Sequence, residues 1–218
     1  MWKKLQRLGQ MPFLNQLHAL SNLYYRIKAA IFYRLFFREL GSGSCIRRPI
    51  LILNAEFISI GRRVMIREGA RLEAVRSSSE RTPCLSIGDD TNIEQNVHIA
   101  CHNRVRIGSK VSITANCSIV DVTHPFADVA EAQKIGGRIQ DDDAFVEIGD
   151  GAFIGIGAVI LPNVRIGQGA VIGANSVVTR DIPPYCTAAG APAAVLRQYD
   201  FTRQQWIRVG VEMASPVA

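Results

Sequence analysis

An aliphatic residue recurs at every sixth position in the second half of the chain. The series runs Ile148, Ile154, Ile160, Ile166, Ile172 and Val178. A period of six fits neither an α-helix, with 3.6 residues per turn, nor a half-buried strand, with a period of two. It fits a chain that turns a corner every six residues and points one aliphatic side chain inward on each side. Three sides make a triangular coil, and stacked coils make a parallel β-helix.

The same spacing extends upstream, with two long interruptions. The further inward positions are Ile46, Ile52, Ile60, Ile66, Leu72, Ile87, Ile93, Ile99, Ile107, Ile113 and Ile119. The long intervals after Leu72 and Ile119 predict extruded loops over residues 73–86 and 121–146. We therefore expect an all-β protein with one solenoid domain over 46–182. A short N-terminal helical segment over 1–45 would precede it, and a C-terminal cap over 183–218 would follow.

Residue types at the other positions of the repeat agree with this reading. Glycine, asparagine and aspartate, which tolerate tight backbone geometry, recur at the predicted corners, as at Gly88, Asn116, Asn163 and Asn175. Small residues follow each aliphatic residue by four positions, where the wall must close on itself. These residues are Thr91, Ala152, Ala158, Ala170 and Ser176. No single coil can bury its interior alone, so stability must come from the stack.

Both ends of the chain show helix-like patterns. Residues 13–40 carry apolar residues at steps of three and four, and Gly41 and Gly43 would end that helix. The stretch QYDFTRQQWIRVG near the C-terminus also looks helical and would cap an exposed end of the solenoid.

The basic residues are concentrated at the N-terminus. Residues 1–48 contain nine Lys or Arg residues and a single acid, Glu39, whereas the rest of the chain is slightly acidic. This asymmetry favours a local anionic partner and argues against nucleic-acid binding along the body. Two readings of the aromatic, basic helix stay open. It could lie on anionic lipid, or it could pack on the solenoid or on a neighbouring subunit.

The compartment is indicated by features that are missing from the sequence. We find no secretory signal and no apolar run of the roughly 18–20 residues that a membrane span requires. The five cysteines are odd in number and form no CxxC pair, which favours a reducing compartment over a disulfide framework. Cys117 is expected to be a packed thiol. We expect a cytoplasmic protein, either free or peripheral at the inner face of the membrane.

The most specific part of the sequence is a family signature. The stretch IGDGAFIGIGAVILPNVRIGQGAVIGANSVVTRDIPPYCTAAGAPAAVLR resembles the hexapeptide-repeat acyltransferases, and the likeness covers about Ile46 to Arg197. Within that family it is most similar to the sugar and polysaccharide O-acetyltransferases. The resemblance implies a left-handed coil, which the periodicity alone does not. It also implies acetyl-CoA as acyl donor and a homotrimer with active sites between subunits.

Acyl transfer from a thioester needs a general base, and histidine suits this role near neutral pH. His124, in the sequence VDVTHPF, lies at the base of the longest loop. It also matches the catalytic histidine of the family, which follows an Ile-Gly corner at the same spacing, here Ile107-Gly108. Asp121 is the nearest upstream acid and therefore the candidate partner that orients His124.

The other histidines have simpler explanations. His18 lies in the predicted helix, where it is structural or solvated. His98 and His102 raise the alternative of a zinc site, because a related branch of hexapeptide-repeat proteins binds zinc through three histidines. Two histidines four residues apart across a bulge fit the geometry of zinc poorly. We expect no metal.

The resemblance also assigns residues to the two substrates. Acetyl-CoA would pass along the later coils, with arginines facing its phosphates. The donor-binding residues would be Phe153, Gly155, Ile156, Ala174, Thr179, Arg180 and Arg197. Glu94 occupies a position where sugar acetyltransferases contact the acceptor, and a carboxylate can accept hydrogen bonds from hydroxyl groups.

Three functions follow from these observations. The first is transfer of acetyl from acetyl-CoA to a sugar hydroxyl in surface polysaccharide or lipopolysaccharide biosynthesis, with a sugar or glycolipid acceptor. The second is N-acetylation of an amino-sugar nucleotide. The third is a non-catalytic solenoid scaffold. A serine acetyltransferase is disfavoured, because the N-terminal segment is too short for the helical domain of those enzymes.

Overall fold

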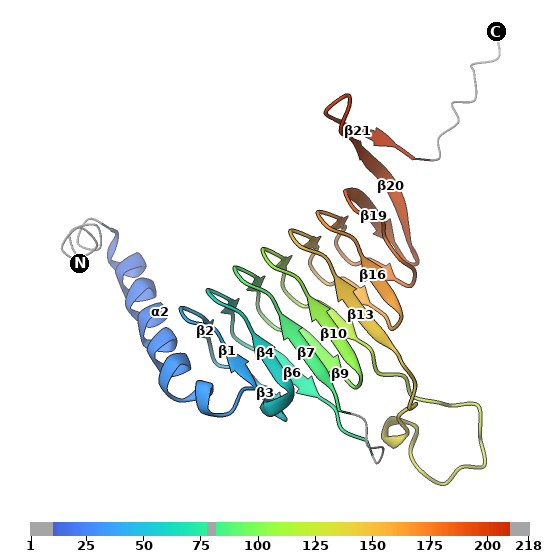
Figure 1. The fold of residues 1–218 in the computed structure, drawn as a ribbon, viewed down its shortest axis with the longest axis horizontal. Helices are drawn as coiled ribbons and strands as arrows, with labels where there is room; N and C mark the ends of the chain where they lie inside the picture. Colours follow the sequence, from blue (N-terminus) through green and yellow to red (C-terminus); the bar gives the residue numbers. More distant parts are fainter. Residues whose placement is uncertain (1–10, 78–81, 210–218) are drawn as a thin grey trace.

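The computed structural model describes residues 11–77 and 82–209. The chain winds around three sheets in turn, so that each coil adds one strand to every sheet (Figure 1). Strands of successive coils pair in parallel, as between β11 (Ser112–Ile113) and β14 (Phe153–Ile154). The predicted parallel β-helix is confirmed.

Each sheet is a ladder of short strands. Sheet A contains β1 (Glu39–Leu40), β4 (Ile58–Ile60), β7 (Cys84–Ile87), β10 (Arg104–Ile107), β13 (Phe145–Ile148) and β16 (Val164–Ile166). Sheet B contains β2 (Cys45–Ile46), β5 (Met65–Ile66), β8 (Asn92–Ile93), β11, β14, β17 (Val171–Ile172), β19 (Cys186–Gly190), β20 (Ala193–Asp200) and β21 (Gln205–Arg208). Sheet C contains β3 (Leu51–Leu53), β6 (Arg71–Ala74), β9 (His98–Cys101), β12 (Ser118–Val120), β15 (Val159–Ile160) and β18 (Val177–Val178).

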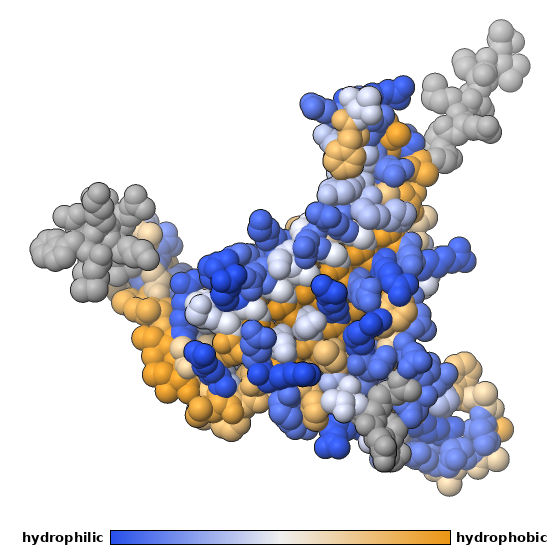
Figure 2. Space-filling model, viewed as in Figure 1, coloured by the Kyte–Doolittle hydropathy of each residue, from blue (hydrophilic) through white to orange (hydrophobic). Residues whose placement is uncertain are grey.

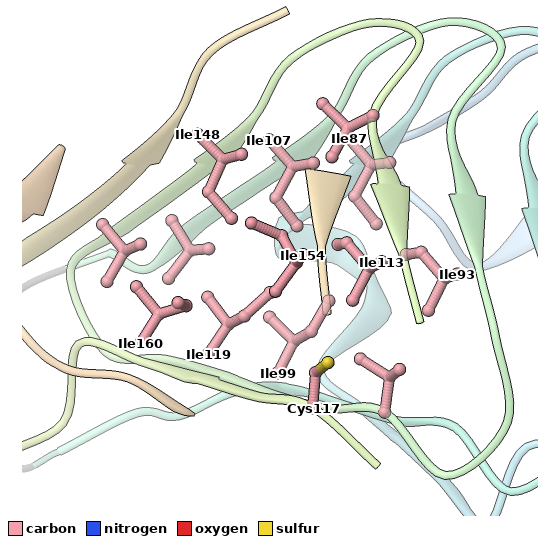
Figure 3. Close-up of a cluster of buried hydrophobic side chains, with 14 of the residues drawn as sticks. Ile87, Ile93, Ile99, Ile107, Ile113, Cys117, Ile119, Ile148, Ile154 and Ile160 are labelled. Carbon is pink, nitrogen blue, oxygen red and sulfur yellow. The ribbon is translucent and has the colours of Figure 1, made fainter. Parts of the chain in front are cut away.

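The predicted inward residues form the core. Isoleucines from all three sheets converge on the axis of the coil (Figure 3), and Ile99, Ile119 and Ile154 are fully buried. The register places like residues side by side, for example Ile119 beside Ile160. Each buried aliphatic side chain contributes roughly 1.5–3 kcal/mol, so the stack is stabilised by many equal increments. Cys117 is buried among these residues as a free thiol, as predicted.

The corners explain the recurring glycines and asparagines. Asn96, Asn116 and Asn175 adopt positive φ angles of 57°, 62° and 54°. Gly88 is required for a different reason, since a Cβ atom there would lie 2.6 Å from the backbone of Gly108 in the next coil. Coils stack at ordinary strand spacing, about 4.8 Å, which leaves no room for a side chain between corners.

The N-terminal segment differs from its prediction. Helix α2 (Phe13–Ile31) is followed by a 3₁₀ turn, η1 (Tyr33–Leu35), and does not continue to residue 40. Glu39 and Leu40 instead pair with β4, and the side chain of Leu40 is buried. The repeat therefore begins one side earlier than predicted, because Leu40 takes the first inward place in sheet A. In the described ranges 11–77 and 82–209, no helix has the length and apolar character of a membrane span.

The helical prediction for the C-terminal stretch is wrong. Strand β19 extends sheet B by a further coil, and β20 and β21 form an antiparallel hairpin at the end of the stack (Figure 1). Tyr199 lies opposite Trp206 in this hairpin, with ring centroids 5.4 Å apart. Cross-strand aromatic pairs of this kind stabilise a hairpin, and they outweigh a helical spacing that has nothing to pack against.

Two loops leave the solenoid between sheets C and A. The first runs from β6 to β7, residues 75–83, and its residues 78–81 lie outside the described part. The second spans 121–144 between β12 and β13 and contains one 3₁₀ turn, η3 (Ile135–Gly137). A further turn, η2 (Ala55–Phe57), joins β3 to β4. The long loops are slightly shorter than predicted, because β6, β7 and β13 extend beyond their inward residues.

Candidate active site

His124 lies near the start of loop 121–144, which projects from the corner between sheets C and A (Figure 1). Its side chain is exposed, and its Nδ1 lies 2.8 Å from the carbonyl oxygen of Arg138. A carbonyl can only accept a hydrogen bond, so this contact places the ring proton of a neutral His124 on Nδ1. Nε2 is then the nitrogen that can accept a proton.

The base of this loop is closed by a second contact. The backbone N–H of Gln140 donates to the carbonyl oxygen of Thr123, at 2.9 Å, next to the His124–Arg138 contact. The two ends of the loop are therefore held together where they leave the solenoid. This gives an exposed histidine a fixed support, as expected where a rigid scaffold carries a functional loop.

Asp121 does not have the predicted role. Its carboxylate is buried and accepts hydrogen bonds from the backbone N–H groups of His102 (2.5 Å), Asn103 (2.9 Å) and Arg104 (2.7 Å). Burial raises the pKa of Asp121, and the three N–H groups oppose that shift. The prediction that Asp121 orients His124 is wrong, because the carboxylate supports the turn before β10 and Arg138 contacts His124.

His98 and His102 have separate surroundings. His98 lies on the outer face of sheet C, with Nε2 2.8 Å from Oε1 of Glu73. His102 is buried at the next corner, with Nδ1 3.1 Å from the carbonyl oxygen of Val75. In the part of the chain that the structure describes, no group of three His, Cys, Asp or Glu residues could hold a metal ion.

Glu94 follows β8 at the corner between sheets B and C. Its Oε2 lies 2.9 Å from Nε of Arg67, which comes from the preceding coil, and the Glu94 side chain is about one third exposed. The ion pair holds the carboxylate in place while leaving part of it open to solvent. Arg67 was not predicted from the sequence, because the spacing of corner residues does not say which side chains pair between coils.

Most of the predicted donor-binding residues lie together. Phe153, on sheet B, is 42% exposed, and Ile156, at the following corner, is 50% exposed. A Cβ atom on Gly155 would lie 2.6 Å from the backbone nitrogen of Ala174, so these two residues lie in direct contact on successive coils. Arg197 lies on β20, which continues the same sheet, opposite Thr187.

Thr179 and Arg180 lie elsewhere. Both follow β18 at the corner between sheets C and A, the same corner from which the His124 loop emerges lower in the stack. Sheet C therefore separates two groups of candidate residues within one chain. Glu94, Ile156 and Ala174 lie along one of its edges, whereas His124 and Arg180 lie along the other. Sheet C is about five residues wide at ~3.3 Å each, so the two groups are roughly 15 Å apart.

A cavity adjoins the loop that carries His124. Its volume is about 680 Å³, and it lies between the two loops at the corner of sheets C and A. Arg76 and Ser77 line it from the first loop, and Pro125, Arg138 and Ile139 line it from the second. A space of this size next to His124 is large enough for a sugar-sized molecule.

The repeat matches a known family. The family model described as bacterial transferase hexapeptide, six repeats, matches residues 145–180. A putative lipopolysaccharide biosynthesis O-acetyl transferase of Escherichia coli K12, WbbJ, is 27% identical over 184 residues, which cover 83% of this chain and 90% of that protein. The chain is therefore similar to the hexapeptide-repeat acyltransferases, over the family model in its later coils and over most of WbbJ.

Other hexapeptide-repeat relatives match over shorter stretches. The galactoside O-acetyltransferase of Escherichia coli K12 is 37% identical over 114 residues, 52% of this chain and 54% of that protein. A putative acetyltransferase of Saccharomyces cerevisiae is 38% identical over 112 residues, 51% of this chain and 55% of that protein. The chain thus spans nine tenths of WbbJ and about half the length of these two.

Solved structures agree on the fold. A hexapeptide-repeat-containing acetyltransferase from Vibrio cholerae has a TM-score of 0.55 and 25% identity, covering 79% of this chain and 80% of that one. AntD, an N-acyltransferase from Bacillus cereus solved with dTDP and coenzyme A, has a TM-score of 0.62 and 19% identity, covering 78% and 88%. The predicted left-handed β-helix is confirmed.

Proposed function

We propose that this protein transfers acetyl from acetyl-CoA to a hydroxyl group of a sugar during the assembly of a surface polysaccharide or lipopolysaccharide. The observation that carries the proposal is the position of His124. It is exposed on a loop that is anchored at its base, its Nδ1 is occupied by the carbonyl of Arg138, and its Nε2 is left to take a proton. These are the requirements for a general base that activates a hydroxyl group.

The reaction proceeds by direct attack. Nε2 of His124 removes the proton from the acceptor hydroxyl, and the oxygen attacks the carbonyl carbon of the thioester. Backbone N–H groups stabilise the oxyanion that forms. The carbon–sulfur bond then breaks, and the coenzyme A thiolate receives the proton from His124. The products are the O-acetyl sugar and free coenzyme A, and His124 is restored.

Two sequence relatives favour a hydroxyl over an amine as the acceptor. WbbJ and the galactoside enzyme are both named O-acetyltransferases. The likeness to the N-acyltransferase AntD, at 19% identity, concerns the fold and does not decide the acceptor. Transfer to the amine of an amino-sugar nucleotide is therefore the second candidate, and the same acceptor experiment decides between the two.

We place the active site between copies of a homotrimer. The two groups of candidate residues lie on opposite edges of sheet C, so a second copy is needed to bring an edge with Glu94 and Ile156 next to an edge with His124. The outer face of sheet A carries charged pairs such as Arg104–Glu147 and Arg165–Glu147, which suit a face toward solvent. Sheets B and C are then the faces available for contact within a threefold assembly.

The test is an acceptor screen with labelled acetyl-CoA, using sugars that offer hydroxyl groups only and amino-sugar nucleotides. We expect label transfer to a hydroxyl sugar. The variant His124→Ala should lose about 10²–10⁴-fold in turnover. The exposed helical residue His18 supplies the control, and His18→Ala should behave as wild type. Transfer only to amines would select the second candidate. Full activity of His124→Ala would show that His124 is not the general base.

We further propose that α2 rests on an anionic membrane surface, where a glycolipid acceptor would be found. An apolar stripe runs along the helix, and its members are 46–71% exposed: Phe13, Leu17, Leu20, Tyr24, Ile27 and Ile31. Figure 2 shows apolar surface over this end of the molecule. The opposite side of α2 packs on the solenoid through Tyr25 and Ala29, so the stripe faces outward. The basic excess of residues 1–48 complements anionic lipid.

Vesicle sedimentation tests the membrane proposal. Wild type should bind vesicles that contain phosphatidylserine and bind phosphatidylcholine vesicles much more weakly. Leu17→Glu together with Leu20→Glu should abolish binding, whereas Leu196→Glu, on the hairpin at the far end of the stack, should not. A different outcome would make the stripe an interface between copies: wild type binds neither kind of vesicle, and the double variant has a lower oligomeric mass in solution than wild type.

A further inference from the structure

Arg138 uses all three of its guanidinium nitrogens inside loop 121–144. Nε donates to the carbonyl oxygen of Gln133 at 2.7 Å, Nη1 to that of Asp128 at 2.8 Å, and Nη2 to that of Glu131 at 2.6 Å. These carbonyls come from different points along the outer part of the loop. One side chain therefore ties together a segment that has no strand of its own.

The backbone of the same residue supports His124. The carbonyl oxygen of Arg138 accepts the hydrogen bond from Nδ1 of His124, at 2.8 Å. The N–H of Arg138 donates to the carbonyl oxygen of Ile135, at 3.0 Å, within the turn η3. Arg138 is thus held from both sides, and its carbonyl points at the imidazole as a consequence.

We infer that Arg138 is the positioning residue of the active-site histidine. Its guanidinium orders the loop, and the ordered loop presents the carbonyl that fixes the tautomer of His124. The inference rests on the proposed function, in which Nε2 of His124 is the base. It assigns the orienting role, predicted for the carboxylate of Asp121, to a backbone carbonyl whose position depends on an arginine side chain 14 residues away from His124.

Arginine suits this role better than lysine. Its planar guanidinium carries five N–H donors in a fixed fork and can serve three separate carbonyls at once. A lysine ammonium is a single point and cannot reach three carbonyls spread along a loop. Hydrogen bonds from a charged donor are also stronger than neutral ones, so three of them offset part of the entropy of ordering a loop with few buried side chains.

The test compares Arg138→Met, Arg138→Lys and the control Arg106→Met. Arg106 is exposed on the outer face of sheet A, away from the loop. With the acceptor found in the screen, we expect kcat of Arg138→Met to fall about 10–100-fold, while KM for acetyl-CoA stays within about twofold. Arg138→Lys should show an intermediate loss, because it restores part of the contact. Arg106→Met should match wild type.

The second readout is the tautomer of His124. Solid-state ¹⁵N spectra of protein labelled at its four histidines report which ring nitrogen carries the proton, and His124→Gln identifies the signal. Wild type should show the Nδ1–H form, and Arg138→Met a mixture that includes the Nε2–H form. A purely structural effect on stability would lower kcat without changing the tautomer, and that result would overturn the inference, as would a wild-type kcat in Arg138→Met.

The two proposals fail in different ways. Absence of turnover by wild type with every acceptor would overturn the proposed function. In that case the tautomer spectra alone would decide whether Arg138 positions His124. Turnover that depends on His124 but not on Arg138 would leave the proposed function in place and overturn the positioning role.

Discussion

At the scale of single residues, the structure separates residues that hold the fold from residues available for chemistry. Asp121 and His124 are three positions apart, yet Asp121 is buried under three backbone N–H groups and His124 is exposed. A buried carboxylate with several backbone donors supports a turn, since each donor would otherwise lose its partner away from water. An exposed imidazole with one nitrogen free can take part in proton transfer.

The variant Asp121→Ala should therefore affect stability more than catalysis. It leaves three N–H groups at the corner before β10 without an acceptor, which should cost about 2–4 kcal/mol in the free energy of unfolding. Denaturant unfolding measures this loss. At a temperature where the variant is folded, kcat should fall by less than about fivefold, because the contact between His124 and Arg138 remains. A large loss of kcat with unchanged stability would return Asp121 to the catalytic site.

At the scale of elements, the coil is the unit, and neighbouring coils are joined at their corners as well as along their strands. Gly88 lies so close to the next coil that a methyl group would lie 2.6 Å from the backbone of Gly108. The same corner between sheets A and B carries the ion pairs Arg62–Asp89 and Arg63–Asp90, each between successive coils. Spacing between coils therefore depends on small residues and on charges placed one coil apart.

Substitution of corner glycines tests this spacing. Gly88→Ala should lower the free energy of unfolding by about 2 kcal/mol or more, because the added methyl group would meet the backbone of Gly108 and Ser109, which cannot give way. Gly136→Ala is the matched control, since a Cβ atom there would meet nothing within 4 Å. We expect its thermal unfolding to match wild type. Equal stability of the two variants would mean that the stack adjusts its spacing freely.

The ion pairs at this corner predict a pH dependence. The backbone N–H and side chain of Arg62 lower the pKa of Asp89, and the side chain of Arg63 lowers the pKa of Asp90. A lowered pKa in the folded state means that the contribution to stability is present above the ordinary carboxyl pKa, about 4, and is lost as the pH falls through the lowered value. Thermal melts should show Asp89→Asn with Asp90→Asn slightly below wild type at pH 7, and the difference should shrink as the pH falls below the ordinary carboxyl pKa, about 4. Because the pairs are exposed, the difference should also shrink in high salt.

At the scale of the whole molecule, sheet C keeps two groups of candidate residues apart within one chain. Glu94 lies along one edge and His124 along the other, with the width of a sheet between them. A rigid prism cannot fold back to join them, so the proposed site requires a second copy. Cyclic symmetry supplies the missing edge to every copy at once.

Mixed assemblies test this arrangement. His124→Ala and Glu94→Ala should each be nearly inactive alone. The two variants are then unfolded together in equal amounts and refolded. An interface is intact when one copy supplies Glu94 and its neighbour supplies His124, which random assembly gives at roughly one interface in four. About a quarter of wild-type activity should therefore return. No recovery, with mixed oligomers verified by mass, would place both residues in a site within one chain.

The sequence by itself determined the repeat, the three walls, the core residues and the corner glycines and asparagines. These follow from local rules that apply again every six residues, so one coil predicts the next. Ile154, for example, is inward because Ile148 and Ile160 are inward.

Only the tertiary structure decided the features outside the repeat. The C-terminal stretch became a hairpin because Tyr199 meets Trp206, and Glu39–Leu40 became the first strand because Leu40 lies beside Ile60. The partner of His124 is Arg138, which no periodicity connects to it. Contacts of this kind join residues through a loop or across coils, and their energies depend on which groups meet in space rather than on spacing along the chain.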